Sequence, residues 1–144
     1  MAENDEHKEL VRRYADDVLT HQRYDLLEQY ITPDFVDHFG RDIEGPIALT
    51  VQMEAMHKSF GDLTFHVVHI VAEDDIVAVH FRVPGIHRDE FSGIPATGCA
   101  VEWKGAMFYR IAGNRIAEGW GYWNVMEIVT TVRTAAADAD GSER

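Results

Sequence analysis

Two side chains in the first forty residues could take part in proton transfer, Tyr14 and Asp37. A carboxyl group buried in an apolar cavity acquires a raised pKa, which suits Asp37 to general-base work near neutral pH. The hydroxyl of Tyr14 can donate a hydrogen bond to a substrate carbonyl. Both residues also have a purely structural interpretation, because an aspartate can hold a turn and a tyrosine in a helical apolar stripe is often core. His38 lies on the other face from Asp37 if this segment is extended.

Apolar residues spaced three and four apart predict three helices in the first sixty residues. Pro33 ends the second helix, because the residue before a proline is pushed out of helical geometry. Pro46 suits the first turn of the third helix. The predicted helices span residues 10–19, 26–31 and 47–60, and residues 34–39, which include Asp37, form a short extended segment or turn.

After Gly61 the apolar period becomes alternating, which indicates β-strands. Helices first and an antiparallel meander afterwards predict an α+β fold. We expect a cone-shaped, curved antiparallel sheet of about four main strands, with the three N-terminal helices enclosing a central cavity. The strands are expected over residues 63–71, 76–83, 101–111 and 115–126, and the irregular connection over 84–99 is either a lid on the cavity mouth or a fixed loop.

The two longest strands place aromatic residues and glycines on one face, because side chains alternate across a strand. Glycine inside a strand leaves space unfilled or lets the sheet bend. The inward glycines therefore predict either a roomy apolar hollow or simple bulges. The residues expected to contact a substrate are Trp103, Met107, Trp123, Gly105, Gly119, Gly121, Met56, Phe81, Asn124 and His38.

Composition disfavours several classes of function. The 144 residues carry 25 acidic and 13 basic side chains, a net charge of −12, which disfavours nucleic acid and anionic membrane surfaces as partners. Cys99 is the single cysteine, so no internal disulfide can form, and no spacing of histidine and carboxylate residues resembles a metal site. The acidic start lacks a signal-peptide core and no apolar run would span a bilayer, so we expect a cytoplasmic protein. One domain is expected over residues 8–133, with disordered ends over 1–7 and 134–144.

Several segments together resemble the SnoaL-like polyketide cyclases of the nuclear transport factor 2-like superfamily. They lie at residues 33–38 (PDFVDH), 45–46, 85–98 (GIHRDEFSGIPATG), 101–102, 108–111, 115–120 (RIAEGW) and 123–124. The resemblance covers roughly residues 8 to 130. It implies a cone-shaped α+β fold with a central cavity, no cofactor, and a homodimer formed through the sheet face. Family members close polyketide rings by intramolecular aldol chemistry, form cyclic ethers, hydrolyse epoxides or act in hydroxylations.

The resemblance also marks a departure from the family pattern. Aldol cyclases of the family carry an acid/base aspartate and a helper histidine on the last strands, where this chain has Gly119 and Gly121 facing Gly105 and Met107. Asp37 falls where the family has a cavity-facing polar residue. Likewise, Asn124 stands where relatives often have aspartate. The large apolar residues suited to a sheet-to-sheet dimer contact are Phe108, Trp120 and Tyr122.

The sequence thus predicts a cofactor-free cyclase that acts on a large apolar polyketide-type intermediate, and leaves two mechanisms open. Either Asp37, with Tyr14, moves a proton during aldol or cyclic-ether formation, or the hollow folds a polyene for a [4+2] cycloaddition as a pericyclase does. The missing acid/base groups favour the second mechanism. A non-catalytic module that binds a hydrophobic ligand is the alternative class. Epoxide hydrolysis ranks last, because Asp37 has no obvious partners for the Asp/Arg/Asp set that this reaction uses.

Overall fold

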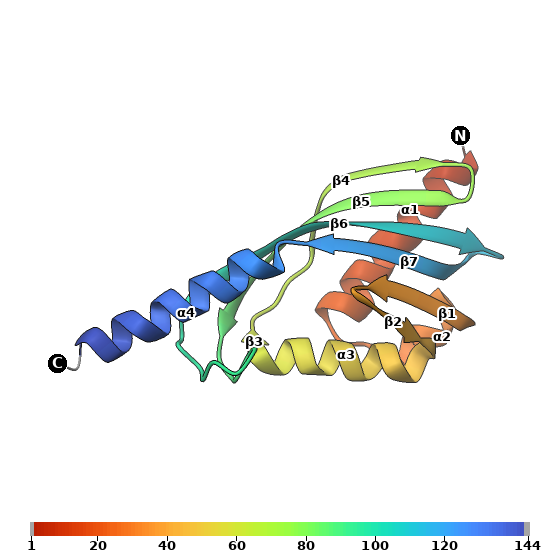
Figure 1. Ribbon diagram of the computed structural model, residues 1–144. Helices are drawn as coiled ribbons and strands as arrows, with labels where there is room; N and C mark the ends of the chain where they lie inside the picture. Colours follow the sequence, from red (N-terminus) through yellow and green to blue (C-terminus); the bar gives the residue numbers. More distant parts are fainter. Residues whose placement is uncertain (1, 143–144) are drawn as a thin grey trace.

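A curved, seven-stranded sheet forms the centre of the protein, and helices pack on its inner face (Figure 1). The computed structural model describes residues 2–142. The sheet order is β2-β1-β7-β6-β5-β3, and β4 pairs with the other part of β5. The strands are β1 Ile31–Phe39, β2 Arg41–Glu44, β3 Phe60–Gly61, β4 His66–Glu73, β5 Ile76–His87, β6 Ala100–Ala112 and β7 Arg115–Trp123.

Four α-helices accompany the sheet. Helix α1 (Ala2–Tyr14) continues as a π-helical turn (Ala15–Thr20), and a 3₁₀ turn (Tyr24–Leu26) leads into the short α2 (Leu27–Tyr30). Helix α3 (Gly45–Ser59) lies across the open end below the sheet, and α4 (Val125–Ser142) projects away from it (Figure 1). The α+β fold expected from the sequence is confirmed.

The sheet is mixed rather than antiparallel. The segment expected as a short extended piece is a full nine-residue strand, β1, which pairs in parallel with β7 and antiparallel with β2. Gly40, at φ +72°, allows the tight turn that joins β1 to β2, because a glycine adopts positive φ without steric cost. The expectation of about four strands missed this edge hairpin.

The described residues near both chain ends, from Ala2 and as far as Ser142, are helical where we expected disorder. Helix α1 starts at Ala2, with Glu3 and Asp5 in its first turn, where the helix dipole favours acidic residues. Helix α4 buries Ile128 and Val132 against the core, so the expected frayed tail over 134–144 is the continuation of an anchored helix as far as Ser142. The expectations for residue 1 and residues 143–144 lie outside the described residues.

The last strand ends at Trp123, three residues earlier than expected, because Asn124 caps helix α4, which begins at Val125. Its side-chain oxygen accepts a hydrogen bond from the Lys104 backbone N–H at 2.8 Å, and its backbone carbonyl accepts one from Ile128. These bonds anchor the start of α4 to β6.

The connection between β5 and β6 is shorter than expected, because β5 continues to His87. Strand β5 runs on to His87, which is fully buried and exchanges backbone hydrogen bonds with Gly98 and Cys99. Phe91 packs its ring against Phe60 and Trp103, with centroids 4.9 and 5.7 Å apart. The structure therefore favours the fixed loop over the lid.

Candidate active site

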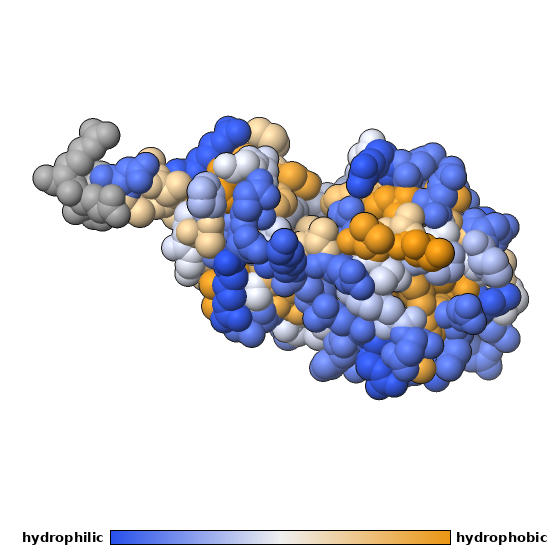
Figure 2. All heavy atoms as spheres, turned by 90° about the horizontal axis from the view of Figure 1, so that it is seen from below, coloured by the Kyte–Doolittle hydropathy of each residue, from blue (hydrophilic) through white to orange (hydrophobic). Residues whose placement is uncertain are grey.

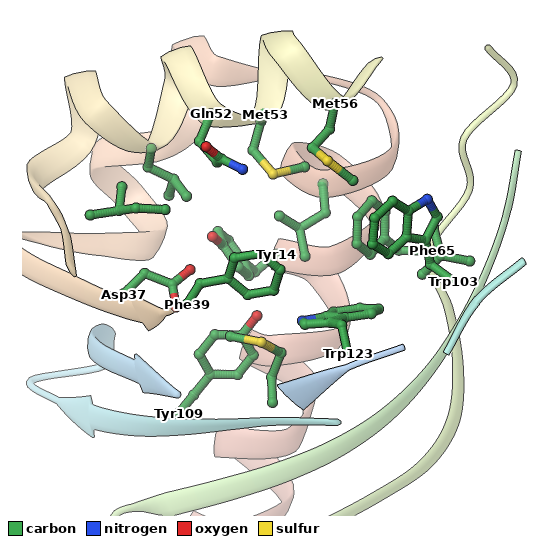
Figure 3. Close-up of a pocket in the computed structure, with 15 residues that line it drawn as sticks. Tyr14, Asp37, Phe39, Gln52, Met53, Met56, Phe65, Trp103, Tyr109 and Trp123 are labelled. Atoms are coloured by element: carbon green, nitrogen blue, oxygen red, sulfur yellow. The ribbon is translucent and has the colours of Figure 1, made fainter. Parts of the chain in front are cut away.

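An apolar cavity lies between the inner face of the sheet and the helices α1 and α3 (Figure 3). Its volume is about 70 Å³, which is room for several water molecules. The lining residues come from both helices, the π-helical turn, β1, β2, β5, β6, β7 and the segment before β4: Tyr14, Leu19, Asp37, Phe39, Ile43, Leu49, Gln52, Met53, Met56, Phe65, Val83, Trp103, Met107, Tyr109 and Trp123.

Asp37 is the one carboxylate among the lining residues. Its Oδ1 atom is buried and has no hydrogen-bond partner among the described residues. Burial raises the pKa of Asp37 to about 6, and the neighbouring charge of His38 opposes this increase. An aspartate of this kind changes its protonation state close to physiological pH, which suits it to accept and return a proton.

Two tyrosine hydroxyls lie at the same end of the cavity as Asp37 (Figure 3). Tyr14 comes from α1 and Tyr109 from β6, and their rings meet edge to face with centroids 5.8 Å apart. Burial, together with the charge of Asp37, raises the pKa of both hydroxyls well above the usual value. Both groups therefore stay protonated and can donate hydrogen bonds to an oxygen that gains negative charge.

The three strand glycines make room for neighbouring side chains. A Cβ on Gly119 would lie 3.2 Å from the Tyr109 ring and 3.3 Å from Oδ1 of Asp37, and one on Gly105 would lie 2.7 Å from the Trp123 ring. A Cβ on Gly121 would meet the sulfur of Met107 at 2.6 Å. Of the two roles left open, the glycines do not widen the hollow, because the space above each backbone is already filled.

Half of the twelve residues expected at the site, counting the two candidates for proton transfer, line the cavity. Tyr14, Asp37, Met56, Trp103, Met107 and Trp123 all do so. Alternation along the strands and the apolar stripe of α1 account for this agreement.

Three other expected residues lie elsewhere. Phe81 is buried behind Trp123, with the two rings stacked 6.0 Å apart, so it supports the wall. Asn124 holds the start of α4, where its amide also donates to the Glu102 carbonyl at 3.1 Å. His38 follows Asp37 in β1 and therefore lies on the opposite face of the sheet, in ion pairs with Asp42 and Glu118.

Several lining residues were not predicted, although strand alternation or helical spacing indicated that they face the cavity. Tyr109 shares the inward parity of Trp103 and Met107 on β6, and Phe39 shares that of Asp37 on β1. On α3, helical spacing brings Leu49, Gln52, Met53 and Met56 to one face.

A second hollow adjoins the cavity between β2 and α3. It shares Ile43 and Gln52 with the cavity, so these two side chains form the wall between them. On the same side of the molecule, apolar residues interrupt the mostly hydrophilic surface (Figure 2), and Ile47 and Val51 of α3 are exposed. A ligand passing between Ile43 and Gln52 would reach the cavity from this hollow.

Two kinds of feature are absent from residues 2–142. No group of three or more histidine, cysteine or acidic side chains is arranged to hold a metal ion. No helix in this range combines the length and the apolar character needed to cross a membrane.

Comparison with known proteins identifies the family. The model of the SnoaL-like polyketide cyclases matches residues 9–132, which hold every residue that lines the cavity. The chain belongs to the SnoaL-like polyketide cyclase family. None of the curated proteins compared matches this SnoaL-like chain.

Solved structures share the fold of this SnoaL-like protein at low sequence identity. A protein of Jannaschia sp. CCS1, provisionally assigned as a SnoaL-like polyketide cyclase, is 22% identical with a TM-score of 0.82, over 90% of this chain and 92% of that one. AclR of Streptomyces galilaeus, provisionally assigned as a hydroxylase, is 24% identical with a TM-score of 0.80, over 90% and 97%. A SnoaL-like polyketide cyclase of Agrobacterium tumefaciens is 19% identical with a TM-score of 0.75, over 87% and 96%.

Proposed function

We propose that this SnoaL-like protein is a cofactor-independent cyclase that closes a ring in a polyketide-type intermediate by proton transfer. Asp37 acts as the general base, and the hydroxyls of Tyr14 and Tyr109 bind the oxygen that becomes negatively charged. The observation that carries this proposal is the buried, unpartnered Oδ1 of Asp37 at the end of the cavity where both hydroxyls lie.

The chemistry balances within one substrate molecule. Asp37 removes a proton from the carbon between two carbonyl groups, and the enolate oxygen accepts hydrogen bonds from the two tyrosines. The enolate carbon then attacks a second carbonyl carbon of the same chain, which forms the new C–C bond and leaves an alkoxide. The protonated Asp37 returns its proton to that alkoxide, so the carboxylate is regenerated and the reaction is an isomerisation without redox change.

The rest of the lining supports ring closure by excluding water and restricting the shape of the chain. Trp103, Trp123 and Phe65 present aromatic surfaces, and Met53 and Met56 cover them from α3. Fixed hydrogen-bond donors act more strongly in such an apolar site than in water. A linear intermediate held in a folded shape also loses less entropy at the transition state.

A [4+2] cycloaddition is the second candidate function. It is supported by the predominance of aromatic and aliphatic side chains in the lining and by the glycines at the family's acid/base positions. This reaction needs only a folded polyene and no proton transfer.

A mass-resolved assay with a linear polyketone or polyene substrate tests both candidates through matched variants. Asp37→Asn keeps the shape of the side chain but removes the base, and should lower kcat by roughly 10²- to 10⁴-fold. Asp34→Asn, a change at an exposed position of the same strand, is the control and should retain full activity. A loss of only a few-fold in Asp37→Asn would overturn proton transfer in favour of the cycloaddition. Binding without conversion by the unmutated protein would indicate a ligand-binding module.

We further propose that two copies pair through the outer face of the sheet. Phe108 and Tyr122 are 41% and 65% exposed there, which is unusual for large apolar side chains in a monomer. Sedimentation equilibrium of Tyr122→Arg against the unmutated protein would test this pairing, and an unchanged mass would argue against it.

A further inference from the structure

His38 bridges two carboxylates on the outer face of the sheet, directly behind Asp37. Its Nδ1 lies 2.6 Å from Asp42 of β2 and its Nε2 lies 2.7 Å from Glu118 of β7. Arg110 of β6 donates to the other oxygen of Glu118 at 3.2 Å. The imidazole also stacks on Trp120, with ring centroids 5.6 Å apart and planes 28° apart.

This arrangement requires a protonated imidazole. A carboxylate only accepts hydrogen bonds, so both ring nitrogens of His38 must donate, and only imidazolium has two N–H groups. Hydrogen bonds to Glu118 and to Asp42 raise the pKa of His38 above its ordinary value, although desolvation opposes them. A positive charge therefore lies in β1 next to the proposed base.

The irregular pairing of β1 explains why a link from His38 to both neighbouring strands matters. Between Ile31 and Val36 strand β1 advances five residues, while its partner β7 advances only two, from Ile116 to Glu118. Regular parallel pairing resumes only at residues 36–38, where Asp37 faces Gly119. On its other side β1 contacts only the short edge strand β2. The position of Asp37 thus depends on a few residues near the edge of the sheet.

We propose that His38 is a positioning residue for Asp37, whose imidazolium clamps β1 between β2 and β7 and whose charge favours the ionised carboxylate. The clamp consists of the bonds from His38 to Asp42 and Glu118. The charge on His38 acts on Asp37 from the adjacent residue, on the other face of the strand. The inference rests on the proposed role of Asp37 as the base.

Few titratable or charged groups face Asp37 or His38. Asp37 faces the hydroxyls of Tyr14 from α1 and Tyr109 from β6, which stay neutral. His38 faces Asp42 from β2 and Glu118 from β7, and Glu118 also binds Arg110 from β6. Burial is the main cause that raises the pKa of Asp37, and the charge of His38 is the cause that lowers it. Loss of the His38 imidazolium should therefore raise the pKa of Asp37 further.

The test is the titration of the Asp37 side-chain carboxyl by ¹³C NMR, assigned by comparison with Asp37→Asn. In His38→Gln the midpoint should move upward by about half a pH unit or more, because a nearby positive charge is lost. Amide hydrogen exchange at residues 36–38 should become faster than in the unmutated protein, because the clamp is open. Arg82→Gln, which removes an exposed ion pair to Glu102 at 3.0 Å on another part of the sheet, should change neither reading.

His38→Lys separates the charge from the clamp. It keeps a positive charge but cannot bridge both carboxylates, so the Asp37 midpoint should stay near that of the unmutated protein while exchange at residues 36–38 becomes faster. This variant also tests the proposal if His38→Gln does not fold.

Both readings are independent of turnover, so the two proposals can fail separately. If the His38 variants leave the Asp37 midpoint and the exchange of residues 36–38 unchanged, the positioning role is wrong. If these readings change as expected but Asp37→Asn remains fully active, the clamp exists while the proposed base is wrong. With both proposals correct, the pH profile of kcat/KM in His38→Gln moves upward together with the NMR midpoint.

Discussion

The carboxylate of Asp37 lies against the backbone of Gly119, the residue that it faces across the parallel strands β1 and β7. Its Oδ1 atom is 3.3 Å from the place where a side chain at position 119 would begin. The resemblance to the family's aldol cyclases implies that they carry an acid/base group on the last strand at positions that include 119. Here a carboxylate from the neighbouring strand lies close to that space, and we propose that it takes the place of the missing group.

An exchange of the two residues tests this replacement. Asp37→Gly alone should lose most of the activity. The double variant Asp37→Gly/Gly119→Asp should recover about tenfold or more of it, because it returns a carboxylate to nearly the same volume. The measurement is kcat on one substrate for the single and double variants. Equal activities in the two variants would show that the carboxylate must come from β1.

The rate should depend on pH through Asp37. A general base works in its ionised form, so kcat/KM should rise with pH and level off above about 6, the pKa of Asp37. Below that pH it should fall about tenfold per unit. A pH–rate profile between 4.5 and 8.5 measures this, and a flat profile would contradict a titrating base.

Asp37 should also make the folded protein less stable at neutral pH. Its pKa is about 6 in the folded chain, against 3.8 for an exposed aspartate, so the folded state holds the proton more tightly. The stabilisation due to the bound proton is fully present below pH 3.8 and is lost as the pH rises through 6. Asp37→Asn should therefore raise the free energy of unfolding by about 2–3 kcal/mol at pH 8, and by less than about 1 kcal/mol at pH 4.

Urea unfolding of both proteins at the two pH values measures this difference. Asp34→Asn, at an exposed position of β1, serves as the control and should show no such dependence. Equal stability of Asp37→Asn and the unmutated protein at pH 8 would mean that the Asp37 carboxylate is well solvated.

Loss of the Tyr109 hydroxyl should affect catalysis far more than stability. Tyr109→Phe removes one donor to the developing oxyanion, and kcat should fall by about ten- to a hundredfold while the ring packing against Tyr14 is kept. Tyr122→Phe removes a hydroxyl from the exposed outer face and is the matched control. If both variants turn over substrate as fast as the unmutated protein, Tyr109 has no part in the reaction.

Local periodicity was sufficient to predict much of the inner wall. Trp103, Met107 and Trp123 share the inward parity of two long antiparallel strands, which depends only on residues close in sequence. Tyr14 likewise follows from the spacing within α1. These residues line the cavity as predicted because the direction of a side chain in a regular strand or helix follows from its position along that element.

The parts of the fold and site that were not predicted depend on contacts between residues that are distant in sequence. The parallel pairing of β1 with β7 joins residues about eighty positions apart, and its irregular register hides the alternation that would have predicted a strand. The last turns of α4 were expected to be a tail because they are small and polar, although Ile128 and Val132 anchor the first turns of the helix. The role of the glycines stayed open between a hollow and bulges, because a sequence does not show which neighbour fills the space above them.

Methionine makes up an unusual share of the cavity wall. Met53, Met56 and Met107 present unbranched thioether side chains with several rotatable bonds, which adapt to irregular shapes more readily than branched residues do. Because the free volume of the cavity is only about 70 Å³, we expect a bound chain to displace some of these side chains. For the proposed cyclase, exchanging single methionines would therefore change the size of ring that the cavity accepts, without rebuilding the sheet.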